Sequence, residues 1–223
     1  MRIAICLSGK SILYKKNYNS LFYNIIKDKN VDIFLHTWNN DYISEIINVY
    51  KPVRYEIENF TDEFILNNIK NKKLIEKYKN KEYPWYSNTN SLGQYYSLNK
   101  CNILKKEYEQ DNNFKYDIVV RCRFDLNFTD NDDIFNQLEL NKLYHSNKIS
   151  SNWLNDQFFF SNSNIMDIAT DIFNNVDKYF DEDIIIFSEN TYQKHWDKND
   201  IIRQKIIINY KICRENGLFL HGY

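Results

Sequence analysis

The N-terminal quarter of the chain alternates apolar runs with stretches of helical spacing, and this rhythm constrains the fold more than any other feature. Apolar runs typical of buried strands occupy Arg2–Ser8 and Val31–Thr37, and residues 53–58 alternate in a strand-like way. Residues 20–26 and 41–50 have the spacing of amphipathic helices. Because parallel strands need a crossover between them, we expect an α/β fold with a mainly parallel sheet flanked by helices.

The rest of the chain continues with helical and strand-like segments, without a repeat or a linker. We expect helices at residues 61–82, 91–109, 164–180 and from Glu189 onward, and strands at 116–128, 141–146 and 155–163. Residues 205–212 fit a strand or a buried helix equally well. A length of 223 residues suits a single domain over residues 1–223.

The composition excludes several classes of partner. Apolar residues make up 43% and charged residues 26%, which is typical of a soluble globular protein. A net charge of −1 gives no electrostatic footprint for nucleic acid. No segment approaches the roughly 20 apolar residues of a membrane span, and the N-terminal apolar run is too short for a secretory signal. We therefore expect no nucleic-acid partner and no membrane span.

The spacing of the cysteines and the amino-acid composition bear on the compartment and the kind of organism in which the protein resides. The four cysteines, Cys6, Cys101, Cys122 and Cys213, are widely spaced and form no C-x-x-C pair, so neither a zinc site nor a disulfide framework is predicted. Lysine, asparagine, isoleucine and tyrosine are abundant, which indicates an AT-rich genome. We expect a cytoplasmic protein, in an AT-rich host or a virus-infected cell.

Three charged residues follow the apolar start of the segment 116–128. Arg121, Arg123 and Asp125 alternate, so a continuous strand places all three on one face, at the carboxyl end where ligands bind in open parallel sheets. The chain has only six arginines against 23 lysines, so two in one strand favour a specific role for the guanidinium group. One interpretation is an ion pair between an arginine and Asp125. The other is a ligand site, with arginine on phosphate and Asp125 on a divalent metal.

Further polar residues are predicted at the same edge of the sheet. Ser8 and Gly9 follow the first strand, where glycine permits close backbone approach to a base or phosphate; an ordinary strand-ending turn is the alternative. Thr37 ends the second strand. Gln94, Ser97 and Cys101 share one face of a helix, because they are spaced i, i+3 and i+7.

Five segments together resemble nucleotide-diphospho-sugar glycosyltransferases of the GT-A type, especially a small viral and bacterial branch with R-x-R-x-D in place of D-x-D. The segments are RIAICLSG (residues 2–9), VDIFLHTW (31–38), QYYSLNKC (94–101), YDIVVRCRFDL (116–126) and NDQFFFSNS (155–163). The resemblance spans about residues 1–200. It implies a GT-A-like fold and transfer of a sugar from a nucleotide-diphosphate donor to a hydroxyl of a glycan or glycoconjugate acceptor.

The resemblance also implies roles for the residues at the donor end. In this family the second Asp of D-x-D binds a divalent metal, Mn²⁺ or Mg²⁺, that bridges the donor diphosphate. Here Arg123 stands at the first position and Asp125 at the second, so Asp125 is the implied metal ligand and His221 its implied partner. A cation on Arg121 or Arg123 shares or replaces the metal's task. The implied donor-binding residues are Leu7, Ser8, Gly9, Thr37, Gln94, Ser97, Arg121 and Arg123.

Asp156 is the expected catalytic base, with Arg123 as its catalytic partner. Asp156 precedes the apolar run QFFF, whose surroundings desolvate a carboxylate, and by resemblance it lies where inverting enzymes place theirs. A loop aspartate that only turns the chain is the alternative. Trp153, Asn155 and Gln157 are the expected acceptor-binding residues.

Other functions fit the sequence less well. A sugar nucleotidyltransferase normally needs a glycine-rich phosphate loop, whereas LSGKS contains one glycine. A noncatalytic nucleotide- or glycan-binding domain is the other alternative. Glu189 and His195 have no nucleophile in a G-x-S-x-G context, so a serine hydrolase is not predicted.

Overall fold

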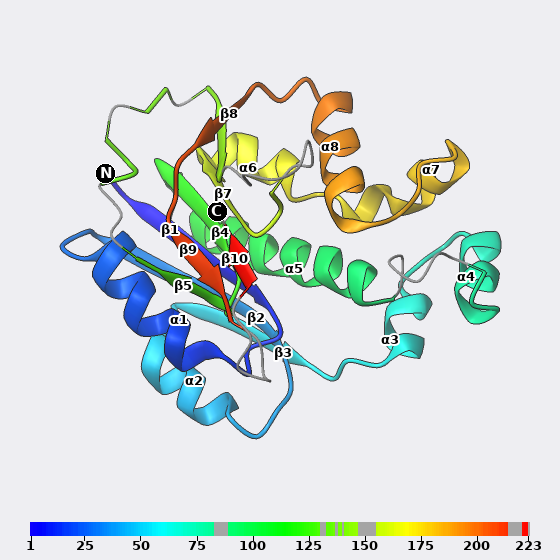
Figure 1. The fold of residues 1–223 in the computed structure, drawn as a ribbon, viewed down its shortest axis with the longest axis horizontal. Coiled ribbons are helices and arrows are strands. Elements are labelled where there is room, and N and C mark those ends of the chain that lie inside the picture. The colour runs from blue at the N-terminus through cyan, green and yellow to red at the C-terminus, as the bar shows by residue number, and fades with distance from the viewer. Residues whose placement is uncertain are drawn as a thin grey trace.

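A seven-stranded sheet runs through the centre of the protein in the order β3-β2-β1-β4-β7-β6-β8 (Figure 1). The computed structural model describes residues 1–82, 89–129, 133–136, 138–139, 141–146, 155–213 and 220–222. The strands of this sheet are β1 (Ile3–Gly9), β2 (Val31–Trp38), β3 (Arg54–Glu58), β4 (Ile118–Cys122), β6 (Leu143–Ser146), β7 (Phe158–Ser161) and β8 (Arg203–Ile206). A second sheet, in the order β10-β9-β5, contains β5 (Leu126–Phe128), β9 (Tyr210–Ile212) and β10 (Leu220–Gly222).

Helices connect most of the strands, as the sequence predicts, although two of the expected helices are divided. The helices of the structure are α1 (Tyr14–Leu21) with a π-helical turn (Phe22–Ile26), α2 (Ile43–Tyr50), α3 (Asp62–Asn67), α4 (Lys72–Lys79), α5 (Thr89–Asp111), α6 (Ser163–Ala169), a 3₁₀ turn (Phe173–Asn175), α7 (Val176–Asp181) and α8 (Ser188–Lys198). Asn71 starts a new helix inside residues 61–82, because its Oδ1 accepts the Leu74 N–H at 3.1 Å.

Strand pairing confirms a mainly parallel sheet. Strands β3, β2, β1 and β4 are parallel neighbours, whereas β7 runs antiparallel to β4 and β6. The chain leaves β1 in one direction to form β2 and β3, and α5 then returns it to place β4 on the other side of β1. The strand order therefore reverses between β1 and β4. In open α/β sheets, ligands bind outside the carboxyl ends of the strands at such a reversal.

The two faces of the sheet bury separate cores. Along β1, Ala4 and Cys6 pack with residues of α5, while Ile5 and Leu7 pack with residues of α1 and α2. Figure 1 shows α1 and α2 on one side of the sheet and α5 on the other. The alternation follows from the two-residue period of a strand, and both faces are apolar because helices cover both.

The expectation of one continuous strand over residues 116–128 is wrong. Strand β4 ends at Cys122 and β5 begins at Leu126, where it pairs with β9 of the second sheet. The buried Asn17 of α1 holds the turn between them, since its Nδ2 donates to the carbonyl oxygens of Arg123 (3.1 Å) and Leu126 (2.9 Å). The chain therefore leaves the large sheet directly after β4.

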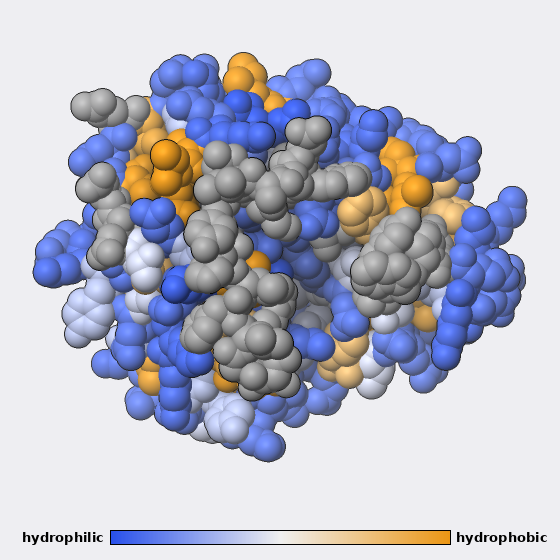
Figure 2. Space-filling view, in the orientation of Figure 1, coloured by the Kyte–Doolittle hydropathy of each residue, from blue (hydrophilic) through white to orange (hydrophobic). Residues whose placement is uncertain are grey.

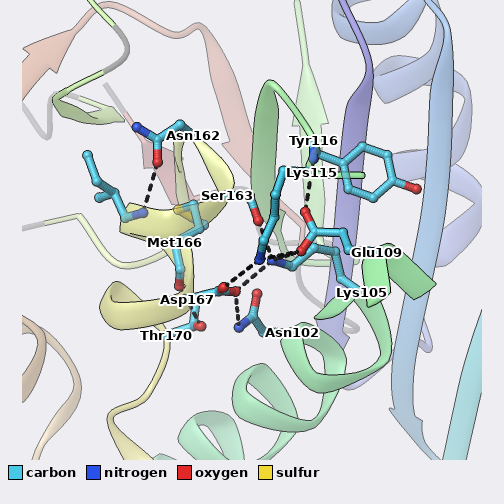
Figure 3. A network of polar contacts seen from close by, with 11 residues as sticks. Asn102, Lys105, Glu109, Lys115, Tyr116, Asn162, Ser163, Met166, Asp167 and Thr170 are labelled. Carbon is cyan, nitrogen blue, oxygen red and sulfur yellow. Dashed lines mark hydrogen bonds and ion pairs between the residues drawn. The ribbon is translucent and has the colours of Figure 1, made fainter. Parts of the chain in front are cut away.

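A buried ionic network fastens α5 to α6 (Figure 3). The Nζ atom of Lys105, whose side chain is fully buried, lies 2.6 Å from Asp167 Oδ1 and 3.1 Å from Glu109 Oε2, and it donates to Ser163 Oγ at 2.7 Å. Lys115 lies 3.0 Å from Glu109 and 3.2 Å from Asp167. The two carboxylates and two ammonium groups balance in charge, which compensates the cost of burying Lys105.

The described residues contain no helix that has both the length and the apolar character needed to cross a membrane. All four cysteines are free and buried. Burial raises the pKa of the Cys122 thiol to about 12, so this thiol stays protonated at neutral pH.

Candidate functional site

The carboxyl end of β1 is held by side chains from β2 and α5. Gly9 has a φ of +106°, which favours glycine, and a Cβ atom added there would meet no atom of the described residues within 4 Å. Its N–H donates to Ser97 Oγ at 2.8 Å, and its carbonyl oxygen accepts from Thr37 Oγ1 at 2.8 Å. Ser8 is buried, and its Oγ has no hydrogen-bond partner among the described residues. Four of the predicted donor-binding residues thus lie together.

One face of α5 points toward this strand end, as its spacing predicts. Ser97 contacts Gly9, the Cys101 thiol donates to the Leu7 carbonyl oxygen at 3.4 Å, and Gln94 Nε2 donates to Asp156 Oδ2 at 2.6 Å. The side chain of Leu7 is fully buried in the core, so Leu7 takes part through its backbone. Helix α5 therefore links the end of β1 to the segment before β7.

Arg121 lies inside β4 and is only 1% exposed. Within the described part of the chain, its Nη1 donates to the Gln157 carbonyl oxygen at 2.5 Å, and its Nε has no hydrogen-bond partner. A guanidinium group has five N–H donors and stays charged. Among the described residues Arg121 forms no ion pair, and burying a cation without a counter-charge costs several kcal/mol, a cost that a bound anion would compensate.

Arg123 and Asp125 lie in the turn after β4 and pair with each other. Arg123 Nε donates to Asp125 Oδ1 at 2.8 Å, and Nη2 donates to Oδ2 at 2.5 Å. This is the ion pair that the sequence left open as an alternative. Burial lowers the pKa of Arg123, but the charge and hydrogen bonds of Asp125, with the charge of Asp156, raise it above its ordinary value. The prediction that Arg121, Arg123 and Asp125 follow one strand face is wrong, because only Arg121 lies in a strand.

Asp156 is 4% exposed and lies just before β7. Besides the hydrogen bond from Gln94, its carboxylate interacts electrostatically with Arg123, Tyr192 and Tyr210. Burial raises the pKa of each tyrosine hydroxyl to about 12, so both are protonated at neutral pH. Asp156 is thus a largely desolvated carboxylate close to a cation. We define the rim site as Ser8, Gly9, Gln94, Arg121, Arg123 and Asp156.

The neighbours of Asp156 are directed at Tyr210 of β9. Asn155 Nδ2 donates to the Tyr210 hydroxyl at 2.5 Å, and that hydroxyl lies 3.2 Å from Gln157 Oε1 and 2.9 Å from Ser146 Oγ. Tyr210 therefore joins β6, β9 and the segment before β7. Its hydroxyl contacts the side chains of the residues that precede and follow Asp156 in the sequence. Sequence reasoning missed it, because one of 18 tyrosines carries no local signal.

The described residues do not fit a preformed divalent metal site. They contain no group of three His, Cys, Asp or Glu side chains able to hold an ion, and Arg123 occupies both carboxyl oxygens of Asp125. The register of the second sheet places His221 opposite Lys211, and Lys211 opposite Asn127, so β10 is two strands away from β5.

Other candidates from the sequence lie in different surroundings. His195 is buried beneath α6, where Nδ1 lies 2.5 Å from the Tyr179 hydroxyl and Nε2 lies 2.7 Å from the Ile168 carbonyl oxygen. Trp153, expected to bind the acceptor, lies outside the described residues. The face seen in Figure 2 is mainly hydrophilic where its residues are described, with apolar side chains in small separate groups.

A protein-family model matches most of the chain. The model of a family described as "Domain of unknown function (DUF7796)" matches residues 1–215. No curated protein is significantly similar to the chain. All residues of the rim site fall inside the matched region.

Proposed function

The chain belongs to the family described as a domain of unknown function, DUF7796, and from its own site we propose that it is a glycosyltransferase that uses a nucleotide-diphosphate sugar. The observation that carries the proposal is the buried Arg121, whose Nε–H has no hydrogen-bond partner among the described residues and which lies beside the point where the strand order reverses. A GT-A-like fold is part of the proposal and is supported by the mainly parallel sheet with helices on both faces.

Two guanidinium groups near one strand end suit a diphosphate. Guanidinium binds phosphate oxygens through two parallel hydrogen bonds, and a diphosphate offers several such oxygens. Arg121 is fixed by its strand, while Arg123 is 25% exposed and can exchange Asp125 for the ligand. Because no atom of the described residues lies within 4 Å of the position of a Gly9 Cβ, the nucleotide can approach the backbone there closely. In this proposal both arginines stabilise the negative charge that develops on the leaving nucleoside diphosphate.

Asp156 acts on the acceptor in the proposed reaction. As the bond between the anomeric carbon and the diphosphate breaks, the acceptor oxygen forms a bond to that carbon and its proton passes to Asp156. Gln94 Nε2 donates to one carboxyl oxygen of Asp156 at 2.6 Å, and in this proposal the other oxygen takes the proton. In this sequence of steps the two arginines supply the positive charge next to the leaving diphosphate.

The proposal is tested by a screen of nucleotide sugars, scored by thermal shift and by release of nucleoside diphosphate. A true donor stabilises the native state by mass action and releases nucleoside diphosphate when an acceptor glycan is present. Arg121→Met keeps most of the side-chain volume but removes the charge, so we expect it to abolish the shift. Arg54→Gln is the matched control, because Arg54 pairs with Asp111 and lies on the edge strand β3, three strands away from β4.

The outcomes separate this function from its rivals. Release of pyrophosphate from a nucleoside triphosphate and a sugar phosphate indicates a sugar nucleotidyltransferase. Binding with neither release nor transfer indicates a noncatalytic nucleotide- or glycan-binding domain. If Arg121→Met binds and turns over the donor as the wild type does, the rim site is not the donor site.

A further inference from the structure

A chain of three buried or partly buried hydrogen bonds runs from the end of β3 to the end of β1. Glu58 Oε2 lies 2.8 Å from His36 Nε2, and His36 Nδ1 lies 2.7 Å from Ser97 Oγ. Ser97 Oγ accepts the N–H of Gly9 at 2.8 Å. His36 and Ser97 are fully buried, and the hydroxyl of Tyr96 donates to the other oxygen of Glu58 at 3.0 Å.

The direction of each hydrogen bond in this chain follows from the chemistry of the groups at its two ends, the Glu58 carboxylate and the Gly9 N–H. A carboxylate only accepts, so His36 Nε2 carries a proton and donates to Glu58. Burial lowers the pKa of His36 despite the opposing effect of Glu58, so the ring is neutral at pH 7 and Nδ1 is an acceptor. The Ser97 hydroxyl therefore donates to Nδ1, which leaves its oxygen free to accept from Gly9.

This arrangement resembles a nucleophile, a base and an acid in line, but its geometry excludes attack by Ser97 on a substrate. The Ser97 side chain is fully buried, and its oxygen already accepts the Gly9 N–H. Ser97 acts instead on the backbone. Its oxygen accepts the Gly9 N–H, and Thr37 donates to the Gly9 carbonyl oxygen, so both polar backbone groups of Gly9 are hydrogen-bonded.

We propose that His36 is a positioning residue, which sets the Gly9 backbone of the donor site through Ser97. The consequence for catalysis rests on the proposed glycosyltransferase function, whereas the link from His36 to Gly9 does not. When the Nδ1 acceptor is lost, the Ser97 hydroxyl donates instead to the His36 backbone carbonyl oxygen, 3.2 Å from Oγ, and this rotation turns the lone pairs of Oγ relative to the Gly9 N–H and weakens that hydrogen bond. The open side of Gly9 then loses its fixed conformation, and the donor binds more weakly.

The Gly9 amide can be observed alone by NMR. The chain has four glycines, and only Gly9 follows a serine, so ¹³C-carbonyl serine combined with ¹⁵N-glycine gives a single signal in an HNCO spectrum. His36→Asn places an amide acceptor near the position of Nδ1, and His36→Gln places its amide near Nε2. We expect the Gly9 signal to stay close to its wild-type position in H36N, and to move in H36Q toward the position seen in Ser97→Ala.

The donor KM is the second readout. We expect H36Q and S97A to raise it roughly fivefold to tenfold, the effect of one lost hydrogen bond, with kcat changed much less. A Gly9 signal that is identical in all variants, or equally displaced in H36N and H36Q, would overturn the proposal. If the variants do not fold, the ¹⁵N shifts of the wild-type His36 ring decide it: a charged ring or an Nδ1–H tautomer overturns it, and a neutral Nε2–H tautomer supports it.

The experiments distinguish failure of the glycosyltransferase proposal from failure of the proposed link between His36 and Gly9. If no nucleotide sugar is turned over, the glycosyltransferase assignment fails while the NMR result still decides the link from His36 to Gly9. If the Gly9 signal moves in H36Q but the donor KM does not, the role of His36 in donor binding is overturned.

Discussion

Arg123 forms a two-point ion pair with Asp125, in which Nε lies 2.8 Å from Oδ1 and Nη2 lies 2.5 Å from Oδ2. The two side chains are 25% and 14% exposed, so the pair is partly screened by solvent. Phosphate and carboxylate use the same face of a guanidinium group. In the proposed donor complex, binding of a diphosphate to Arg123 would therefore exchange one ion pair for another.

This exchange gives a prediction for Asp125→Asn. Because the amide no longer competes for Arg123, we expect the variant to bind the nucleoside diphosphate up to about fivefold more tightly, which is ~1 kcal/mol for a partly exposed pair. Calorimetry with EDTA and then with Mn²⁺ measures the effect, and Asp41→Asn is an exposed control. Weaker binding that appears only with Mn²⁺ would show instead that Asp125 holds a metal.

Asp156→Asn tests the proposed base. Asparagine keeps the shape of the side chain, and the Gln94 amide can rotate to preserve their hydrogen bond, so the fold and the donor KM should change little. We expect kcat to fall by roughly 10²-fold to 10⁴-fold, the usual contribution of a positioned general base. Rates of nucleoside diphosphate release at saturating acceptor measure this, and a variant with wild-type kcat would remove Asp156 from the chemistry.

Lys105 at the centre of the network in Figure 3 gives a stability prediction. In Lys105→Ala, the carboxylates of Glu109 and Asp167 lose their buried partner, so we expect the free energy of unfolding to fall by roughly 3–5 kcal/mol. Lys106→Ala, at the next position of α5, should stay within about 0.5 kcal/mol of the wild type. Urea unfolding of both variants measures the difference, and equal stabilities would mean that the network contributes nothing.

Because His145 is buried, we predict that the protein loses stability in acid. Burial lowers its pKa from 6.5 to about 4, so between these values the unfolded chain binds a proton that the folded chain does not. Stability from the neutral ring is therefore complete above about pH 6.5 and declines as the pH falls, by up to roughly 3 kcal/mol at about pH 4, since one pKa unit is worth about 1.4 kcal/mol.

His145→Gln should flatten this part of the pH dependence of unfolding. Part of the slope should remain, because burial also lowers the pKa of His36 and His195. Urea unfolding across the same pH range measures both slopes, and His145 has no such role if the two profiles run parallel.

The sequence predicted the parts of the site that depend on local spacing. The alternation of strands and helices before residue 58 led to a parallel sheet, and the i, i+3, i+7 spacing placed Gln94, Ser97 and Cys101 on one face of α5. Gly9 was found because a loop directly after a buried strand favours glycine. These features follow from periods of two and 3.6 residues, which the sequence displays directly.

Only the tertiary structure determined which of the charged residues lies in strand β4 and which lie in the turn after it. Alternation over residues 116–128 is the same whether the strand continues or passes into a second sheet, and Asn17, more than 100 residues earlier, holds the turn that separates Arg121 from Arg123. The contacts of Tyr210 with Asn155, and of His36 with Ser97, likewise join segments far apart in the chain. The sequence by itself therefore determined which elements form and which residues lie at their ends, whereas long-range hydrogen bonds, which leave no local periodicity, decided which of those residues meet.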